Sequence, residues 1–97
     1  MDLEIQYLIE ELYNMYEYMT KMLKKDVTFL IMNNIRDIKT IEIYLDQLLN
    51  IPTDKAQELF KQLCDYYMTI NKENAESYLE IYKEMYEEEP KNKKRTK

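Results

Sequence analysis

The sequence predicts an all-α fold, a small antiparallel helical bundle of three to four helices. The 97 residues include no glycine, although the hairpin turns and bulges of a sheet-rich domain need residues that adopt positive φ easily. Apolar side chains recur at steps of three and four along most of the chain, which is the period of an amphipathic helix. The predicted helices cover about 2–24, 26–49, 54–70 and 74–89.

The first predicted helix carries an apolar stripe that we expect to be buried. Its members are Ile5, Leu8, Leu12, Met15, Met19 and Met22, widened by Ile9, Tyr16 and Leu23. Lys24 and Lys25 suit a helix C-terminus, and Asp26 suits the cap of the next helix. We therefore place a break at residue 25. Because no glycine or proline stands there, one continuous long helix is the alternative.

The second predicted helix ends at the firmest boundary in the chain. Its apolar positions are Val27, Ile31, Ile35, Ile38, Ile41, Leu45, Leu48 and Leu49. The run "IEIYL" alternates like a strand for only a few residues, so the length of the segment favours a helix. Asn50 can adopt the left-handed conformation that glycine usually supplies, and Pro52 disfavours α geometry at Ile51. The sequence predicts an ordered break at 50–53.

The third and fourth predicted helices are separated by a short polar connection at 71–74. Thr53 or Asp54 caps the third helix, whose expected buried side is Ala56, Leu59, Phe60, Leu63, Tyr66, Tyr67 and Ile70. The fourth helix carries Ala75, Tyr78, Leu79, Tyr82, Met85 and Tyr86 and ends before Pro90. The connection has no helix breaker, so fusion of the two helices is the alternative.

The length supports one domain, which we place at residues 1–90, with a thin core that oligomerisation would supplement. Cys64 is the only cysteine, which excludes an internal disulfide. Met1 is followed at once by Asp2 and Glu4 rather than by a basic and then apolar export signal. No window approaches the roughly 20 apolar residues that span a bilayer. We therefore expect a cytoplasmic protein without membrane contact.

The composition removes most common enzyme designs. The chain has no histidine, which is the usual base and zinc ligand near neutral pH, and no glycine-rich loop for a phosphate. Glu10, Glu11 and Glu17 share one predicted helix, and we interpret them as a solvated face. Cys64 lies at the edge of an apolar stripe, where we expect a half-buried, inert thiol. The sequence predicts no catalytic residue, no metal and no cofactor.

The charges are unevenly distributed along the chain. Residues 1–90 carry nine basic and nineteen acidic side chains, whereas "KNKKRTK" at 91–97 carries five cations and no carboxylate. These cations are Lys91, Lys93, Lys94, Arg95 and Lys97. We expect a flexible, solubilising tail that is dispensable for folding. The alternatives are a basic arm for nucleic acid or an acidic partner, and an acidic body that mimics nucleic acid and inhibits a nucleic-acid-binding protein.

These observations favour a non-enzymatic interaction protein, a small regulator or adaptor. Abundant isoleucine, asparagine, lysine and tyrosine are typical of AT-rich genomes, such as those of low-GC bacteria and their viruses or mobile elements. A second apolar face opposite the main stripes is the candidate interface for a homodimer or another protein. It consists of Phe29, Met32 and Ile43, with Tyr7 and Tyr18 at its edge. The alternative is that the second helix is central and packed on both sides.

Overall fold

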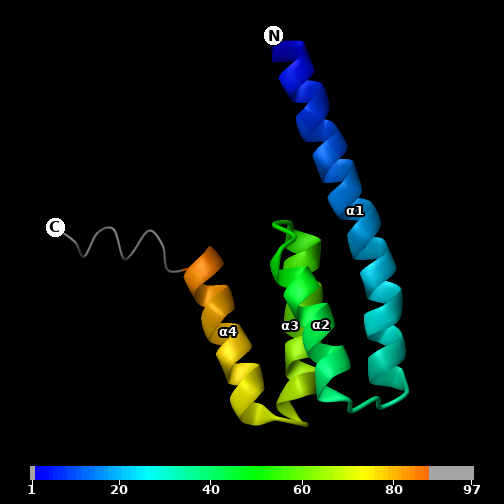
Figure 1. Cartoon of the computed structure of the whole chain (residues 1–97), viewed down its shortest axis with the longest axis vertical. Helices are drawn as coiled ribbons and strands as arrows, with labels where there is room; N and C mark the ends of the chain where they lie inside the picture. The colour runs from blue at the N-terminus through cyan, green and yellow to red at the C-terminus, as the bar shows by residue number, and fades with distance from the viewer. Residues whose placement is uncertain (1, 88–97) are drawn as a thin grey trace, which may run out of the picture.

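The computed structural model describes residues 2–87 and confirms the all-α fold. It contains four helices and, within these residues, no strand: α1 (Asp2–Met32), α2 (Ile38–Leu49), α3 (Asp54–Met68) and α4 (Lys72–Tyr86). The chain runs alternately down and up, so that consecutive helices are antiparallel (Figure 1). No helix in this part of the chain is long and apolar enough to cross a membrane.

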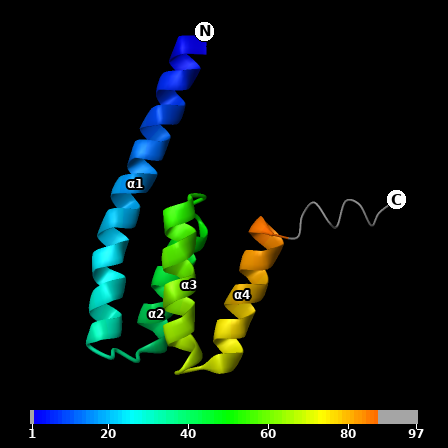
Figure 2. The ribbon, with the colours of Figure 1, turned by 180° about the vertical axis from the view of Figure 1, so that it is seen from behind.

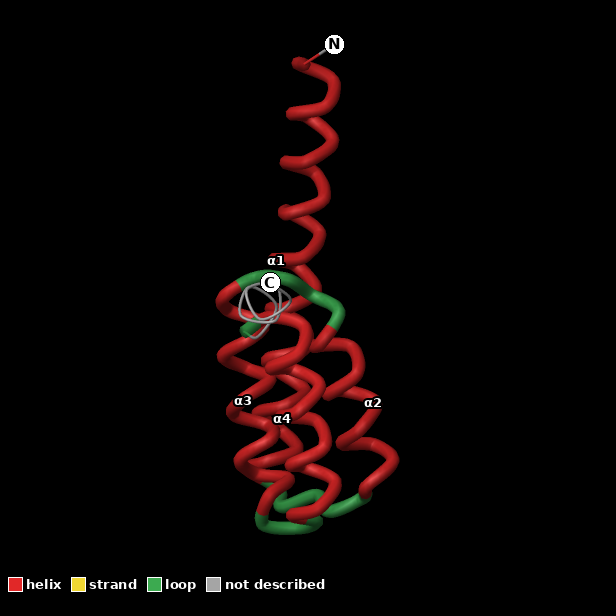
Figure 3. Tube along the Cα trace, turned by 90° about the vertical axis from the view of Figure 1, so that its left-hand side faces the viewer, coloured by secondary structure: helices red, strands yellow, loops and turns green. Residues whose placement is uncertain are grey.

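Helix α3 is central, because it packs against α1, α2 and α4. Figure 2 shows the same arrangement from behind, with α4 on one side of α3 and α1 on the other. Helix α1 has 31 residues against 15 for α3, so at 1.5 Å per residue it is about 46 Å long against about 22 Å. Figure 3 shows that its N-terminal half rises well beyond the other three helices.

The hydrophobic core forms around α3, between this helix and α2, α4 and the C-terminal half of α1. Its largest fully buried side chains are Tyr67, Phe60, Ile41, Leu45, Leu48, Ile51, Leu63, Val27 and Cys64. The rings of Phe60 and Tyr82 stack at 5.4 Å between centroids and join α3 to α4. The predicted stripes of the second, third and fourth helices supply most of this core, although Ile38 and Met85 remain exposed.

The break predicted at residue 25 is wrong. Helix α1 continues through Lys25 to Met32, because Leu23, Val27 and Leu30 on consecutive turns are all buried and no helix breaker separates them. The helix ends where Asn34 adopts a left-handed φ of 54°. The N–H of Ile35 donates to Leu30 O at 2.9 Å and that of Asn34 donates to Ile31 O at 3.1 Å. This is a Schellman motif in which asparagine replaces glycine.

Each of the later helices begins at a capping side chain. Asp37 accepts a hydrogen bond from the backbone N–H of Thr40, Thr53 accepts one from Ala56, and Asn71 accepts one from Asn74. These bonds satisfy N–H groups that have no partner within the helix. The predicted break at 50–53 is confirmed, although Asn50 has φ −88° rather than a left-handed conformation. Helix α3 ends at 68 rather than 70, and α4 covers 72–86 rather than 74–89.

Six tyrosines fasten the helices to one another through their hydroxyl groups. Tyr44 of α2 donates to Asp26 of α1, and Tyr66 of α3 donates to the carbonyl of Ile35. The other four bonds lie at the α2, α3 and α4 contacts: Tyr67 to Glu42, Tyr78 to Asp46, Tyr82 to Gln57, and Tyr86 to the carbonyl of Leu49. Tyrosine suits this use because its ring fills apolar space while its hydroxyl finds a polar partner.

Candidate interaction surface

The apolar stripe of α1 that the sequence predicts to be buried is largely uncovered. Its six members, which we name the α1 stripe, are Ile5, Leu8, Leu12, Met15, Met19 and Met22, and all six are exposed. Leu8 is 64% and Met15 56% exposed. The expectation fails because α1 is longer than its neighbours, so from residue 2 to 15 no other described helix lies beside it to cover these side chains.

A second line of α1 side chains makes the contacts with the bundle. We name this line the docked seam; its members are Tyr16, Thr20, Leu23, Val27 and Leu30, all of them buried or half-buried. At 100° per residue, the centre of the docked seam lies about 70° around the helix from the centre of the α1 stripe. Helix α1 therefore packs one side against its own bundle, and the adjacent apolar side is not covered by any residue between 2 and 87.

The α1 stripe has the spacing of a coiled-coil seam. Its steps of three, four, three, four and three place Ile5, Leu12 and Met19 at heptad positions a and Leu8, Met15 and Met22 at positions d. The pattern stops at the next a position, which is Asp26 and bonds to Tyr44 of α2. Three heptads are thus apolar and exposed, which is the minimum length that indicates a coiled coil.

The charge of α1 reverses along its length. Residues 2–17 contain five carboxylates and no cation, and residues 18–32 contain three lysines and one aspartate. The two halves therefore carry formal charges of −5 and +2. Glu10, Glu11 and Glu17 are all exposed in the acidic half, as expected for a solvated face. These charged groups lie on the same helix as the α1 stripe. A partner bound to the stripe would therefore lie next to a negative N-terminal half and a positive C-terminal half.

The four tyrosines of α1 differ from the six that fasten the bundle. Tyr7, Tyr13 and Tyr18 are exposed and Tyr16 is half-buried. None of the four donates its hydroxyl to another group within residues 2–87. Tyr13 and Tyr16 pack edge to face, with centroids 5.8 Å apart. The rings of Tyr7, Tyr13 and Tyr18 are therefore available at a surface, whereas Tyr16 packs against the core as part of the docked seam.

The structure changes the grouping of the predicted interface residues. Because α1 is continuous, Tyr7, Tyr18 and Phe29 are spaced by 11 residues and fall within about 40° of one another around a single helix. Met32 lies on the same side, whereas Ile43 lies on α2 and no longer shares a helix with them. All five side chains are exposed, Phe29 at 60% and Ile43 at 54%. They form a sparse second face of α1 rather than a patch centred on the second helix.

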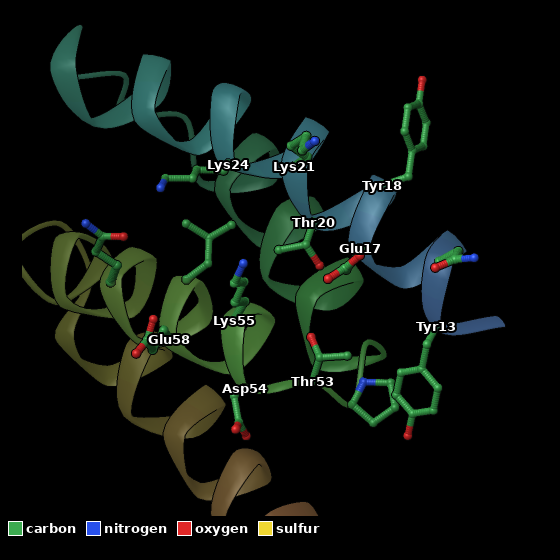
Figure 4. A pocket seen from close by; sticks show the side chains of 14 residues that line it. Tyr13, Glu17, Tyr18, Thr20, Lys21, Lys24, Thr53, Asp54, Lys55 and Glu58 are labelled. Atoms are coloured by element: carbon green, nitrogen blue, oxygen red, sulfur yellow. The ribbon is translucent and has the colours of Figure 1, made fainter. Parts of the chain in front are cut away.

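An open groove lies between α1 and the start of α3 (Figure 4). Its volume is about 1120 Å³. Side chains of both signs line it, namely Glu17, Lys21, Lys24, Asp54, Lys55 and Glu58. Tyr18 points away from the groove. The three carboxylates and three lysines cancel in formal charge, so the groove selects neither an anion nor a cation.

Cys64 is fully buried rather than half-buried as expected, because α3 is packed on several sides. Burial, and secondarily the charge of Asp65, raise the pKa of its thiol to about 12. The thiol therefore stays protonated near neutral pH, and this is unfavourable for a nucleophile. Within residues 2–87, no group of three or more cysteine, aspartate or glutamate side chains could hold a metal ion.

The basic tail predicted at 91–97 lies outside the described residues. Comparison of the chain with protein-family models, with curated proteins and with solved structures found no match.

The sequence pattern identifies the members of the α1 stripe, but it predicts them to be part of the core. The signal that could have corrected this was the length of α1: an uninterrupted helical pattern from 2 to 32 is about twice as long as either of the last two helices.

Proposed function

We propose that this chain is a non-enzymatic interaction module, a small regulator or adaptor that docks onto protein through the α1 stripe. The observation that carries the proposal is the exposure of three consecutive apolar heptads on a helix that extends beyond its own bundle. Monomeric soluble proteins rarely expose a contiguous apolar patch larger than a few hundred Å², and larger patches mark interaction sites.

The composition of this surface supports docking to protein. Methionine and tyrosine supply large contact areas, and both are enriched at protein interfaces. Met15, Met19 and Met22 lie in the stripe, and Tyr18 flanks it. The helix that presents them is fastened at its other end by the docked seam. An occupant would therefore meet a helix whose direction is already set, and this lowers the cost of ordering the interface.

Photo-crosslinking in the source cells tests the proposal. Leu8 is replaced by a photoreactive phenylalanine derivative, and Glu84, an exposed residue of α4, is replaced in the same way as the control. We expect a covalent adduct of defined mass from position 8 and none from position 84. A Leu12→Glu change on the same helix face should abolish the adduct from position 8 while leaving the helical content unchanged.

The result has two informative parts. An adduct at position 8 supports docking whether it contains a second copy of this chain or a different protein. The absence of an adduct at position 8, or equal adducts at both positions, would overturn the proposal.

A further inference from the structure

We propose that the occupant of the α1 stripe is the α1 stripe of a second copy, and that the two helices form an antiparallel two-stranded coiled coil. The inference rests on the proposed function, because it uses the same surface. It adds the identity of the partner, the direction of the partner helix and the pairing of individual residues.

The charge polarity of α1 decides the direction. In a parallel dimer the two halves with charge −5 would lie side by side, and like charges at this distance repel. In an antiparallel dimer that pairs the two stripes over their full length, residues 2–9, with charge −2, lie against residues 18–25 of the other copy, with charge +3. Only residues 10–17, with charge −3, lie against the same segment of the other copy. Opposite charges beside a coiled-coil seam set partner choice and orientation. The distribution of charge therefore favours a second copy running in the opposite direction.

The heptad positions fix the register. In an antiparallel pair, the a side chains of one helix lie in layers with the d side chains of the other. Pairing the two stripes over their full length gives three kinds of layer: Ile5 with Met22, Leu8 with Met19, and Leu12 with Met15 of the second copy. Each layer combines a branched aliphatic side chain with a flexible methionine that can fill the remaining space.

The residues flanking the seam match in this register. Glu4, Glu11, Tyr18 and Lys25 occupy the g positions. In antiparallel coiled coils the g positions of the two helices face one another, so Glu4 meets Lys25 and Glu11 meets Tyr18 of the second copy. The first is an ion pair, and in the second the tyrosine hydroxyl can donate to the carboxylate. Symmetry makes each pair occur twice.

The fold leaves room for this arrangement. The docked seam lies about 70° around α1 from the stripe, so the bundle and the second copy occupy adjacent sides. Because residues 2–15 extend beyond the other helices, the two bundles would lie at opposite ends of the paired helices. Met19 and Met22 lie beside the bundle but remain exposed, so the stripe is open over its full length.

Cysteine mixing measures both association and direction. Leu8→Cys and Met19→Cys chains of distinguishable mass are equilibrated together in a glutathione redox buffer. We expect the disulfide between the two different chains to predominate, because positions 8 and 19 share a layer. The unchanged chain is the control and should form no disulfide, since Cys64 is buried. A predominant Leu8→Cys homodisulfide would show parallel helices and overturn the proposal.

A charge exchange tests the register independently by sedimentation. Lys25→Glu should weaken self-association by about fivefold or more, because it removes two flanking ion pairs and introduces repulsion. Glu4→Lys combined with Lys25→Glu should restore it. Lys39→Glu on α2 makes the same change in net charge away from the stripe and should have little effect.

A chain that remains monomeric at every concentration would also overturn the dimer. In that case an adduct with a different protein at position 8 would still support the proposed function, so the two failures are distinguishable. Loss of association by Lys25→Glu without rescue in the double variant would reject this register.

Discussion

The hydroxyl of Tyr67 on α3 donates a 2.5 Å hydrogen bond to Oε2 of Glu42 on α2. Asn74 of α4 donates to the same oxygen at 3.2 Å, so one carboxylate joins three helices. We predict that Tyr67→Phe lowers the free energy of unfolding by about 1.5–3 kcal/mol, the usual contribution of a hydrogen bond to a charged group. Urea unfolding measures the change. Tyr7→Phe, at an exposed position, is the matched control and should change it by less than about 0.5 kcal/mol.

The same tyrosines make the fold sensitive to alkaline pH. Burial raises the pKa of Tyr44, Tyr67, Tyr78 and Tyr86 above 10.0, and a neighbouring carboxylate adds to this at the first three. The unfolded chain loses these protons near pH 10, earlier than the folded chain. Their contribution to stability is therefore complete below pH 10 and is lost as the pH rises through the folded-state values.

Tyr78→Phe isolates this effect. We predict that the decline in unfolding free energy between about pH 9 and pH 11 is smaller in this variant than in the unchanged chain. Urea titrations at several pH values provide the measurement. An identical decline in both chains would mean that Tyr78 ionises equally easily in the folded and unfolded states.

Two leucines of similar chemistry should respond oppositely to truncation. Leu45 is fully buried in the core, so Leu45→Ala should lower the free energy of unfolding by about 2–5 kcal/mol. Leu8→Ala should change it by less than about 0.5 kcal/mol in dilute, monomeric protein and should instead weaken self-association. Thermal unfolding at two concentrations separates these effects. A large loss of monomer stability in Leu8→Ala would mean that the N-terminal half of α1 folds back onto the bundle.

The cap of α3 gives a prediction about a single backbone bond. Thr53 Oγ1 accepts the N–H of Ala56 at 3.3 Å. Thr53→Ala should lower the free energy of unfolding by about 1 kcal/mol, whereas Thr53→Asp should retain most of it because aspartate also caps helices. Chemical denaturation of the three chains decides between these outcomes.

Charged substitutions separate the two candidate surfaces of the molecule. Phe29→Glu and Ile43→Glu should leave self-association intact, since both positions lie off the α1 stripe, whereas Leu12→Glu should abolish it. Light scattering on each purified variant reports the mass. The opposite pattern would return the interface to the face formed by Tyr7, Tyr18, Phe29, Met32 and Ile43.

The sequence predicts most of the fold because the residues that end and begin its helices act on their immediate neighbours. Pro52 and the cap at Thr53 define the connection between α2 and α3 from neighbouring residues alone. Lys25 was misleading because a lysine favours a helix end without enforcing one. Asparagine does replace glycine at the end of a helix, but the residue that adopts the left-handed conformation is Asn34 and not the predicted Asn50.

The interaction surface was harder to predict for a physical reason. Periodicity reports which side of a helix is apolar, but it does not report whether the neighbouring helices are long enough to cover that side. Leu8 and Val27 both belong to apolar stripes with helical spacing in the sequence. Val27 is nevertheless 0% exposed, whereas Leu8 is not covered. Two features make the difference. Helices α2 and α3 are short relative to α1, and Val27 lies in the docked seam whereas Leu8 lies on the adjacent α1 stripe.

The anchoring of α1 at one end also determines how its free end orders. Starting an isolated helix is unfavourable, because the first turn fixes several residues for one hydrogen bond, whereas each added residue propagates it readily. The docked seam supplies the first turns, so residues 2–15 grow from an existing template and fray only from the N-terminus. Amide exchange in this segment should therefore rise steadily toward Asp2 in the monomer and become uniformly slow when the stripe is occupied.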